Sequence, residues 1–568
     1  MKWRILILSA ISLFFTACQV QENIQDGQTA YKLKKYKLAA ELLQKDFNKA
    51  ELPDEKSKIA FQIGESYANN NNYENAGEWY FKAYDLGYES EAILQYALML
   101  KAQEKYEEAL KEFEKYLLEE PYRRPEMTLE MDACKNGIAW KQRQENEYER
   151  DTYVTEITTL NSGDADFNPV IYQGDKLIFT SSRDMSTGEN NDSWTGDKYY
   201  DLYVANIKDV TSFSAPELFK GPFNAAYNDG TLAFNKDYSE VYFTRCGSDD
   251  RKVDDYCGIY VSNYLPDGGW SEPVALPFFD DTMNIGTPCL SLDGNTLFFA
   301  ATNPDGYGGA DIYMSRRTES GWDAAYNAGQ VINTSGNEVF PYFDSEGVMY
   351  FSSDKHPGLG GLDIFSATWK NNKFSNIKNL EYPINSGADD FGMILLDKKQ
   401  FADSDTLNAG YFSSNRKGGM GDDDMYFFAK TTKKLRPPVF VLKGTVLEKV
   451  YLDSLDVNST VLDTIPLDKS IATLSYPNEQ TLLGKWNIGD EGIFSIQVDS
   501  LKEYKITGMK EGYFNNTTYV STKTAKGKPG DTVVVYASVV LDKIPIAIGE
   551  KAGEIKLKNI YYDYNDSS

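Results

Sequence analysis

The spacing of hydrophobic residues changes along the chain and predicts two kinds of structure. From about Ile24 to Arg150, apolar residues recur every three or four positions in a segment rich in Ala, Glu, Lys, Leu and Tyr, which predicts amphipathic helices. After Glu156, short apolar runs alternate with clusters of Gly, Asn, Asp and Pro, which predicts a β-rich region. A basic, proline-marked linker, Lys433–Pro438, then precedes a further β-rich stretch over residues 439–545.

The helical segment contains an internal repeat. A tyrosine followed three residues later by an alanine occurs three times: Tyr36 and Ala39, Tyr73 and Ala76, Tyr106 and Ala109. The pattern resembles the tetratricopeptide repeat, whose period is about 34 residues. The resemblance implies a solenoid of paired helices over residues 18–150, capped by a helix near Met127–Arg150. An unrelated helical bundle is the alternative, and either would offer a concave helical surface to a protein partner.

The central β-rich region contains five copies of a two-strand pattern. The second strand of each copy ends in an aromatic residue, and these residues are Tyr203, Tyr260, Tyr313, Phe365 and Tyr426. The steps between them, from 52 to 61 residues, fit four short strands with their loops. The region from 151 to 432 is therefore predicted to be a five-bladed β-propeller.

The third copy is the clearest, with an Asp293-Gly294 turn and a second strand that starts at Asp311. It resembles the TolB-like (PD40) propeller repeat. The aspartate before each second strand is interpreted as structural, because Asp side chains accept hydrogen bonds from turn backbone. Binding of Ca²⁺ by Asp422–Asp424 or by Asn303–Gly306 is the alternative, although neither spacing matches an EF-hand loop.

The third region resembles a carboxypeptidase-regulatory-like β-sandwich, a non-catalytic module. The resemblance rests on Gly444-x-Val446, Gly492-x-Phe494 and Gly512-Tyr513. After it, Ile555–Tyr564 looks like the first strand of an OmpA-like domain. Residues 546–568 are therefore expected to be the start of a truncated peptidoglycan-binding domain, which would make this chain a fragment.

The N-terminus predicts a lipid-anchored secreted protein. Lys2 and Arg4 precede an apolar run that is too short to span a bilayer, so residues 1–17 are interpreted as a signal peptide. The run ends in Phe15-Thr16-Ala17-Cys18, which resembles the bacterial lipobox and implies lipid attachment at Cys18. An ordinary signal-peptidase site is the alternative. The resemblance to bacterial lipoproteins further implies, from Gln19, the outer membrane with a periplasm-facing chain.

Composition excludes several classes of function. With 58 basic and 85 acidic residues, the net charge of −27 argues against binding to nucleic acid, which needs a basic surface. The chain has a single histidine, His356, which is expected in an exposed loop. Histidine-dependent triads and zinc sites are therefore improbable, and no Gly-x-Ser-x-Gly elbow is present. We predict a non-enzyme with no catalytic residue, no cofactor and no metal ligand.

The cysteines indicate one disulfide. Cys246 and Cys257 flank one predicted hairpin, where their Cα atoms would be close enough to be bridged, and an oxidising periplasm would permit the bond. Cys134 and Cys289 lie in different repeat classes and are expected to remain buried thiols.

The order of these regions resembles the OmpA-family lipoproteins of Bacteroidetes, which include a component of the type IX secretion system. The resemblance implies an outer-membrane scaffold that docks envelope proteins of the secretion or gliding machinery and, in complete form, tethers them to peptidoglycan. The alternative is a lipoprotein that binds glycans or peptides through propeller aromatics, with Trp194, Trp270 and Trp322 as candidates. Repeated packing within the blades is the simpler explanation for Trp270 and Trp322.

Overall fold

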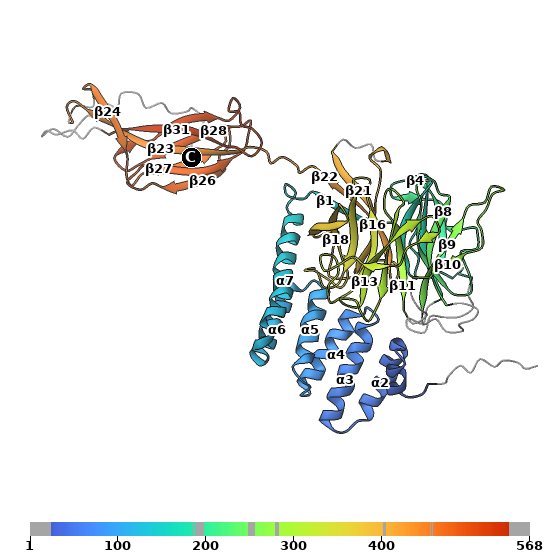
Figure 1. Ribbon diagram of the computed structural model, residues 1–568. Helices are drawn as coiled ribbons and strands as arrows, with labels where there is room; N and C mark the ends of the chain where they lie inside the picture. Colours follow the sequence, from blue (N-terminus) through green and yellow to red (C-terminus); the bar gives the residue numbers. More distant parts are fainter. Residues whose placement is uncertain are drawn as a thin grey trace, which may run out of the picture. The chain divides into compact units, whose positions relative to one another are not determined.

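The computed structural model describes residues 24–184, 186–187, 198–247, 256–278, 283–400, 405–454, 456 and 458–544. The chain divides into two compact units, Met1–Lys433 and Lys434–Ser568 (Figure 1). The first unit contains the helices and a ring of β-sheets, and the second is all β. Cys18, Trp194 and residues 546–568 lie outside the described residues.

The first unit begins with an all-α region, as predicted. Each helix packs on the next one along the chain, and the last is the longest. The helices are α1 (Gly27–Lys32), α2 (Tyr36–Lys49), α3 (Pro53–Ala68), α4 (Tyr73–Asp85), α5 (Glu91–Ala102), α6 (Tyr106–Glu119) and α7 (Arg124–Glu145), with a 3₁₀ turn at Pro121–Arg123.

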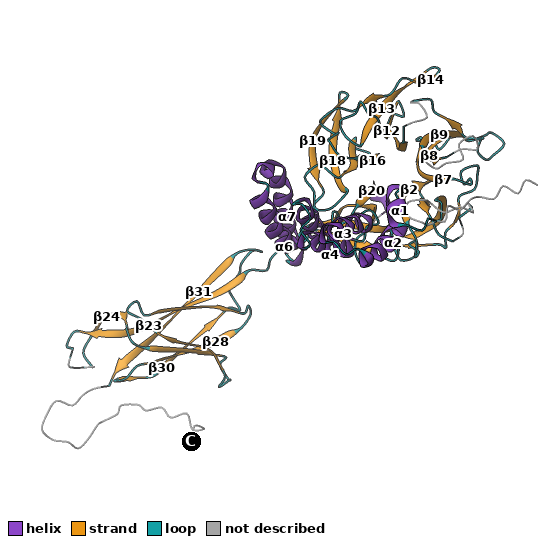
Figure 2. Ribbon diagram, turned by 90° about the horizontal axis from the view of Figure 1, so that it is seen from below, coloured by secondary structure: helices purple, strands orange, loops and turns teal. Residues whose placement is uncertain are grey.

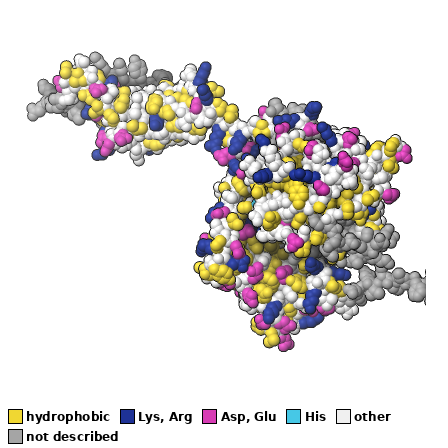
Figure 3. All heavy atoms as spheres, viewed as in Figure 1, with side chains coloured by type: hydrophobic (Ala, Val, Ile, Leu, Met, Phe, Trp, Pro, Cys, Tyr) yellow, Lys and Arg dark blue, Asp and Glu magenta, His cyan; other side chains and the backbone are white. Residues whose placement is uncertain are grey.

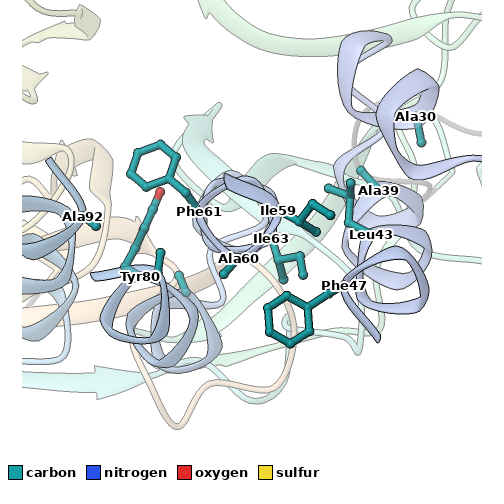
Figure 4. Close-up of a cluster of buried hydrophobic side chains, with 12 residues drawn as sticks. Ala30, Ala39, Leu43, Phe47, Ile59, Ala60, Phe61, Ile63, Tyr80 and Ala92 are labelled. Carbon is teal, nitrogen blue, oxygen red and sulfur yellow. The ribbon is translucent and has the colours of Figure 1, made fainter. Parts of the chain in front are cut away.

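Small residues allow the helices to approach closely. Ala39, Ala76 and Ala109 are fully buried. A methyl group added to Gly64 would lie 2.8 Å from the ring of Tyr80, so glycine lets this tyrosine of α4 lie flat on α3. Figure 4 shows the apolar side chains of α2 and α3 converging between these helices. The burial of the repeated alanines is what their spacing predicts.

The β region of the first unit consists of five antiparallel sheets, called blades 1 to 5 below. Blade 1 contains β2 (Asp166–Tyr172), β3 (Lys176–Ser181), β4 (Asp201–Asp209), β5 (Ser212–Phe213) and β6 (Glu217–Leu218). Blade 2 contains β7 (Asn228–Phe234), β8 (Glu240–Cys246), β9 (Cys257–Asn263) and β10 (Val274–Ala275). Blade 3 contains β11 (Ile285–Leu290), β12 (Thr296–Thr302), β13 (Ala310–Thr318), β14 (Gly321–Trp322) and β15 (Tyr326–Asn327).

Blades 4 and 5 complete the set. Blade 4 contains β16 (Glu338–Phe343), β17 (Val348–Ser353), β18 (Asp363–Lys370) and β19 (Lys373–Asn379). Blade 5 contains β20 (Asp390–Leu395), β21 (Thr406–Ser414) and β22 (Asp424–Thr431), and its fourth strand is β1 (Thr152–Glu156) from the beginning of the region. Because β1 pairs with β22, the two ends of the β region are joined within one sheet.

The blades form a closed, propeller-like ring (Figure 2). Their first strands contact one another in the cycle β2, β7, β11, β16, β20 and back to β2. Each first strand has a β-bulge with one residue in the left-handed conformation, and these residues are Asn168, Thr231, Thr287, Phe340 and Gly392. The expectation of repeated antiparallel sheets is therefore confirmed, with four strands in blades 2, 4 and 5 and a fifth short strand in blades 1 and 3.

The second unit has two sheets around one core. The strands are β23 (Val439–Tyr451), β24 (Val461–Pro466), β25 (Ile471–Ser475), β26 (Leu482–Asn487), β27 (Ile493–Val498), β28 (Glu503–Met509), β29 (Tyr513–Phe514), β30 (Asn516–Ser521) and β31 (Thr532–Lys543). One sheet is mixed, because β23 runs parallel to β31, and the other has the order β26-β25-β28-β30. Leu442, Leu474 and Leu541 belong to the shared core.

Candidate functional site

The helical region has an open groove between α1, α2 and α3. The groove has a volume of about 780 Å³ and is lined by ten residues: Gln28, Asp46, Lys49, Ala50, Glu51, Leu52, Glu55, Lys58, Ile59 and Gln62. The two glutamines face each other across it, because the Gln28 amide nitrogen lies 2.5 Å from the side-chain oxygen of Gln62. The groove therefore combines amide groups, charges and exposed apolar surface, a mixture that suits a protein segment.

The groove is slightly acidic. Lys49 lies 3.5 Å from Asp46, and Lys58 lies 2.9 Å from Asp54, so nearby carboxylates offset both lysines. Glu51 and Glu55 form no ion pair among the described residues. Charged side chains of both signs stand side by side on the helical region in Figure 3. A partner segment with positive charge would complement the two glutamates.

A tyrosine–glutamate pair lies on the same helices. The Tyr31 hydroxyl donates to the Glu65 carboxylate at 2.5 Å, linking α1 to α3 across 34 residues, the repeat period. Burial raises the pKa of Glu65 above its usual range, and burial with the neighbouring Glu65 raises the pKa of Tyr31. The pair fixes the spacing of the two helices that frame the groove.

The helices are fixed to blades 4 and 5 of the ring. Leu359, from the loop between β17 and β18, is fully buried in the core of α5, α6 and α7. The backbone N–H of Gly387 donates to Glu104 at 3.1 Å, and Lys141 of α7 reaches the other oxygen of Glu104 at 2.6 Å. The Arg143 side chain lies 2.5 Å from Glu381. These contacts make the helices and the ring one body.

Three blades contain the same arginine clamp. In blades 1, 2 and 5 an arginine forms an ion pair with a fully buried aspartate, which is the first or second residue of the first strand. The same arginine lies over two aromatic rings and donates hydrogen bonds to backbone carbonyls of a preceding loop. The pairs are Arg183 with Asp166, Arg245 with Asp229 and Arg416 with Asp390. Burial outweighs Arg245 and raises the pKa of Asp229 to about 7.

His356 takes the place of this arginine in blade 4. Its ring packs against Phe351 and Phe365, and its Nε2 atom lies 2.7 Å from the carbonyl oxygen of Ile332. Glu338 replaces the clamp aspartate and accepts hydrogen bonds from Thr334 and Ser353. The prediction that His356 is an exposed turn residue is wrong: it does lie in a loop, but the aromatic ring pair of its blade half-buries it.

A second set of aspartates holds the loops that precede the third strands. Asp201, Asp311, Asp363 and Asp424 each accept a backbone N–H from such a loop. A methyl group on Gly358 would lie 2.0 Å from the Asp363 carboxylate, so glycine is required where the loop folds over it. Burial raises the pKa of Asp363 to about 7 and that of Asp424 to about 6. Their role is structural, as the sequence pattern indicates.

The ring encloses a central cavity of about 250 Å³. Four consecutive residues from each first strand line it: 168–171, 231–234, 287–290, 340–343 and 392–395. At four of the five bulges, the backbone N–H donates to a hydroxyl group, as in Thr231 to Thr180 and Thr287 to Thr244, both at 3.0 Å. These bonds join neighbouring blades and hold the left-handed residues at the cavity wall.

The tryptophan candidates that the structure describes pack in the ring, Trp270 against blade 2 and Trp322 between blades 2 and 3. Trp270 contacts Phe223, Phe234 and Tyr264. Trp322 contacts Tyr242 and lies beneath the Arg317 guanidinium. The packing explanation therefore accounts for both residues.

Cys246 and Cys257 face each other on β8 and β9 and form a disulfide. Cys134 and Cys289 are buried free thiols, and burial raises the pKa of each to about 12, so neither is a reactive thiolate at neutral pH. Within the described residues, no group of three His, Cys, Asp or Glu side chains could hold a metal ion, and no helix is long and apolar enough to cross a membrane.

No family model matches the chain, and no curated protein matches it. Among solved structures, a putative TolB from Agrobacterium tumefaciens is 12% identical, covers 50% of this chain and 98% of its own, and has a TM-score of 0.29. An alpha-L-arabinofuranosidase from Clostridium thermocellum is 11% identical, with 53% and 94% covered and a TM-score of 0.29. The resemblance to TolB-like propellers is thus distant, and scores this low carry no argument about function.

Sequence reasoning missed the groove, the arginine clamps and the role of Leu359. The clamps had a signal, because Arg183, Arg245 and Arg416 each follow an aromatic strand of the repeat by a few residues. The repeat pattern predicts a concave helical surface, but the location of the groove had no local signal, because its lining comes from three helices whose relative placement only the fold determines.

Proposed function

We propose that this chain is a scaffold lipoprotein, anchored in the outer membrane through Cys18 and facing the periplasm, that docks envelope proteins. In this proposal the helices are a tetratricopeptide solenoid, the ring is a TolB-like five-bladed propeller and the second unit is a carboxypeptidase-regulatory-like sandwich. The docked proteins belong to type IX secretion or gliding machinery. In complete form, an OmpA-like domain starting near residue 546 would add a tether to peptidoglycan.

The observation that carries the proposal is the rigid attachment of the helices to the ring beside an open groove. Leu359, Glu104 and Arg143 fix α5 to α7 on blades 4 and 5, whereas the groove is formed by α1 to α3. A partner bound in the groove is therefore held at a defined position relative to the ring. Such fixed presentation is the property that a scaffold needs.

The groove is tested by affinity capture from cell envelopes. We expect the wild-type protein to recover outer-membrane secretion components, and the double variant Glu51→Lys, Glu55→Lys to recover several-fold less, because its groove has lost its negative charge. The matched control is Glu107→Lys, Glu114→Lys, which reverses two exposed charges on α6. Equal recovery by all three proteins would rule out the groove, and recovery of lipoprotein-processing factors alone would rule out the scaffold.

The anchor is tested by metabolic labelling with a fatty acid. We expect the wild-type protein to incorporate the label and to be found in the membrane fraction. The Cys18→Ser variant should be unlabelled and released, because acyl chains on one cysteine supply the anchoring free energy. Cys134→Ser is the control and should be labelled normally. Label that persists on the Cys18→Ser variant would contradict the lipobox.

The central cavity supports a second candidate function, the binding of a small glycan or peptide end. A volume of about 250 Å³ approaches the lower range of ligand pockets. We expect saturation-transfer NMR to detect binding of a peptidoglycan disaccharide to the wild-type protein. Binding should be lost in Ala233→Phe, because the larger side chain narrows the cavity, and kept in the control Ala275→Phe on exposed β10. Transfer signals that persist in Ala233→Phe would place any binding elsewhere.

A further inference from the structure

The second unit has an outer strand in which every residue is exposed. This strand, β24, lies at the end of the sheet order β24-β23-β31-β29 and pairs with the second half of β23, from Leu447 to Tyr451. An outer strand of a sheet presents backbone N–H and C=O groups that its own sheet does not use. Those groups are available to an incoming extended segment.

The side chains of β24 indicate pairing with another chain. Val461, Leu462 and Ile465 are strand-forming apolar residues with exposed fractions of 44%, 60% and 42%. Within the described part of the unit, none of the three belongs to the hydrophobic core. Outer strands usually avoid such residues, because they invite strand pairing. Pro466, which lacks an N–H, limits the pairing edge to the residues before it.

Charge decides which occupant fits. From Val450 to Leu467 the chain carries three aspartates, Asp453, Asp456 and Asp463, and neither lysine nor arginine. A second copy that paired antiparallel over residues 461–465 would place Asp463 directly opposite its own counterpart, and like charges across a strand pair are destabilising. A segment with a positive charge at that position would be stabilised instead.

We propose that β24 accepts, by strand addition, an extended segment of a partner protein in which apolar residues flank a lysine or arginine. The basic side chain lies opposite Asp463, and the apolar side chains lie opposite Val461, Leu462 and Ile465. This surface belongs to the second unit and goes beyond the proposed scaffold function, since it depends on neither the lipid anchor nor the helical groove.

The probe is a fluorescent peptide, Thr-Thr-Val-Thr-Lys-Val-Val-Thr-Thr, whose lysine and valines lie opposite Asp463, Ile465, Leu462 and Val461 in an antiparallel pair; it is titrated with the full chain and followed by anisotropy. We expect wild-type protein to bind it, Asp463→Lys to bind it roughly tenfold more weakly, and Leu462→Asp to bind it more weakly as well. A second peptide with a central glutamate should show the reverse order, binding Asp463→Lys better than wild type. This charge exchange also shows that the variant is folded.

The matched control is Leu482→Asp, which alters another exposed leucine, on β26, an outer strand of the other sheet. It should leave the affinity unchanged. The proposal is overturned if wild-type protein does not bind, if both peptides bind both proteins equally, or if Leu482→Asp abolishes binding. Binding that requires removal of residues 545–568 would overturn it too, because the chain itself would then be the occupant. None of these results bears on capture through the groove.

Discussion

At the scale of single residues, the ring repeats the arginine clamp in three blades and replaces its residues in the other two. Arg183, Arg245 and Arg416 each pair with a buried aspartate, whereas blade 4 combines His356 with Glu338. In blade 3, Ile285 occupies the aspartate position and is buried. A buried carboxylate without its cation lowers the stability of the fold. The acid and its partner are therefore both replaced in blade 4 and both absent in blade 3.

The buried Asp363 carboxylate should make the stability of the ring depend on pH. Its pKa rises from 3.8 to about 7 on folding because burial disfavours the charged form, so the folded state binds a proton that the unfolded state has already lost. Stability should therefore increase as the pH falls from 7 toward 4. Asp363→Asn should remove roughly 1–2 kcal/mol of this dependence, measured by chemical denaturation at pH 5 and pH 8.

Asp305→Asn is the control for this measurement, since Asp305 is an exposed loop residue of blade 3. Its pH dependence should match that of the wild type. If Asp363→Asn also matches the wild type, the Asp363 carboxylate does not change its proton occupancy on folding and the argument from burial fails.

At the scale of elements, the loops between second and third strands have different roles in different blades. The loop between β17 and β18 carries His356 on blade 4 and, three residues later, Leu359 in the helical core. The equivalent hairpin of blade 2 carries the Cys246–Cys257 disulfide. One position in the blade thus serves attachment in one copy and cross-linking in another.

Removal of the Leu359 side chain should loosen the helices from the ring. Leu359→Ala should cost about 2–5 kcal/mol, because it leaves a cavity among α5, α6 and α7, and Leu359→Asp should cost more. Hydrogen exchange should then rise in α5 and α7 and in residues 354–362. Leu292→Asp, at an exposed turn, is the control; unchanged exchange in the Leu359 variants would mean that other contacts hold the helices.

The disulfide should stabilise blade 2. Closing a loop across a sequence separation of 11 residues contributes roughly 3 kcal/mol in the chain-entropy model. The double variant Cys246→Ser, Cys257→Ser should therefore have a lower Tm, and added reductant should lower the wild-type Tm to the same value. A variant that remains sensitive to reductant would point to another disulfide.

At the scale of the whole molecule, repetition explains how much of the fold could be predicted. The aromatic steps from Tyr203 to Tyr426 indicated the number of blades, because each blade repeats the same strands. Closure through β1 and the seating of Leu359 in the helices gave no local signal, because both depend on contacts between segments far apart in sequence. His356 was misplaced for the same reason: its burial comes from a ring pair that its own loop does not contain.

Closure of the ring by β1 should control the stability of the first unit as a whole. The backbone N–H of Ile157 donates to the carbonyl of Met425, and that of Thr431 donates to the carbonyl of Asp151. Hydrogen-bonded and non-hydrogen-bonded pairs alternate along an antiparallel ladder, so the N–H of Thr155, two residues before Ile157, also points toward β22. Thr155→Pro removes this bond at the joint between the two ends of the ring. It should lower the unfolding transition of residues 24–433 by several degrees in calorimetry. Thr155→Val keeps the N–H and should leave that transition in place, and neither variant should shift the transition of residues 434–544. If Thr155→Pro unfolds at the wild-type temperature, the ring does not depend on β1 for its closure.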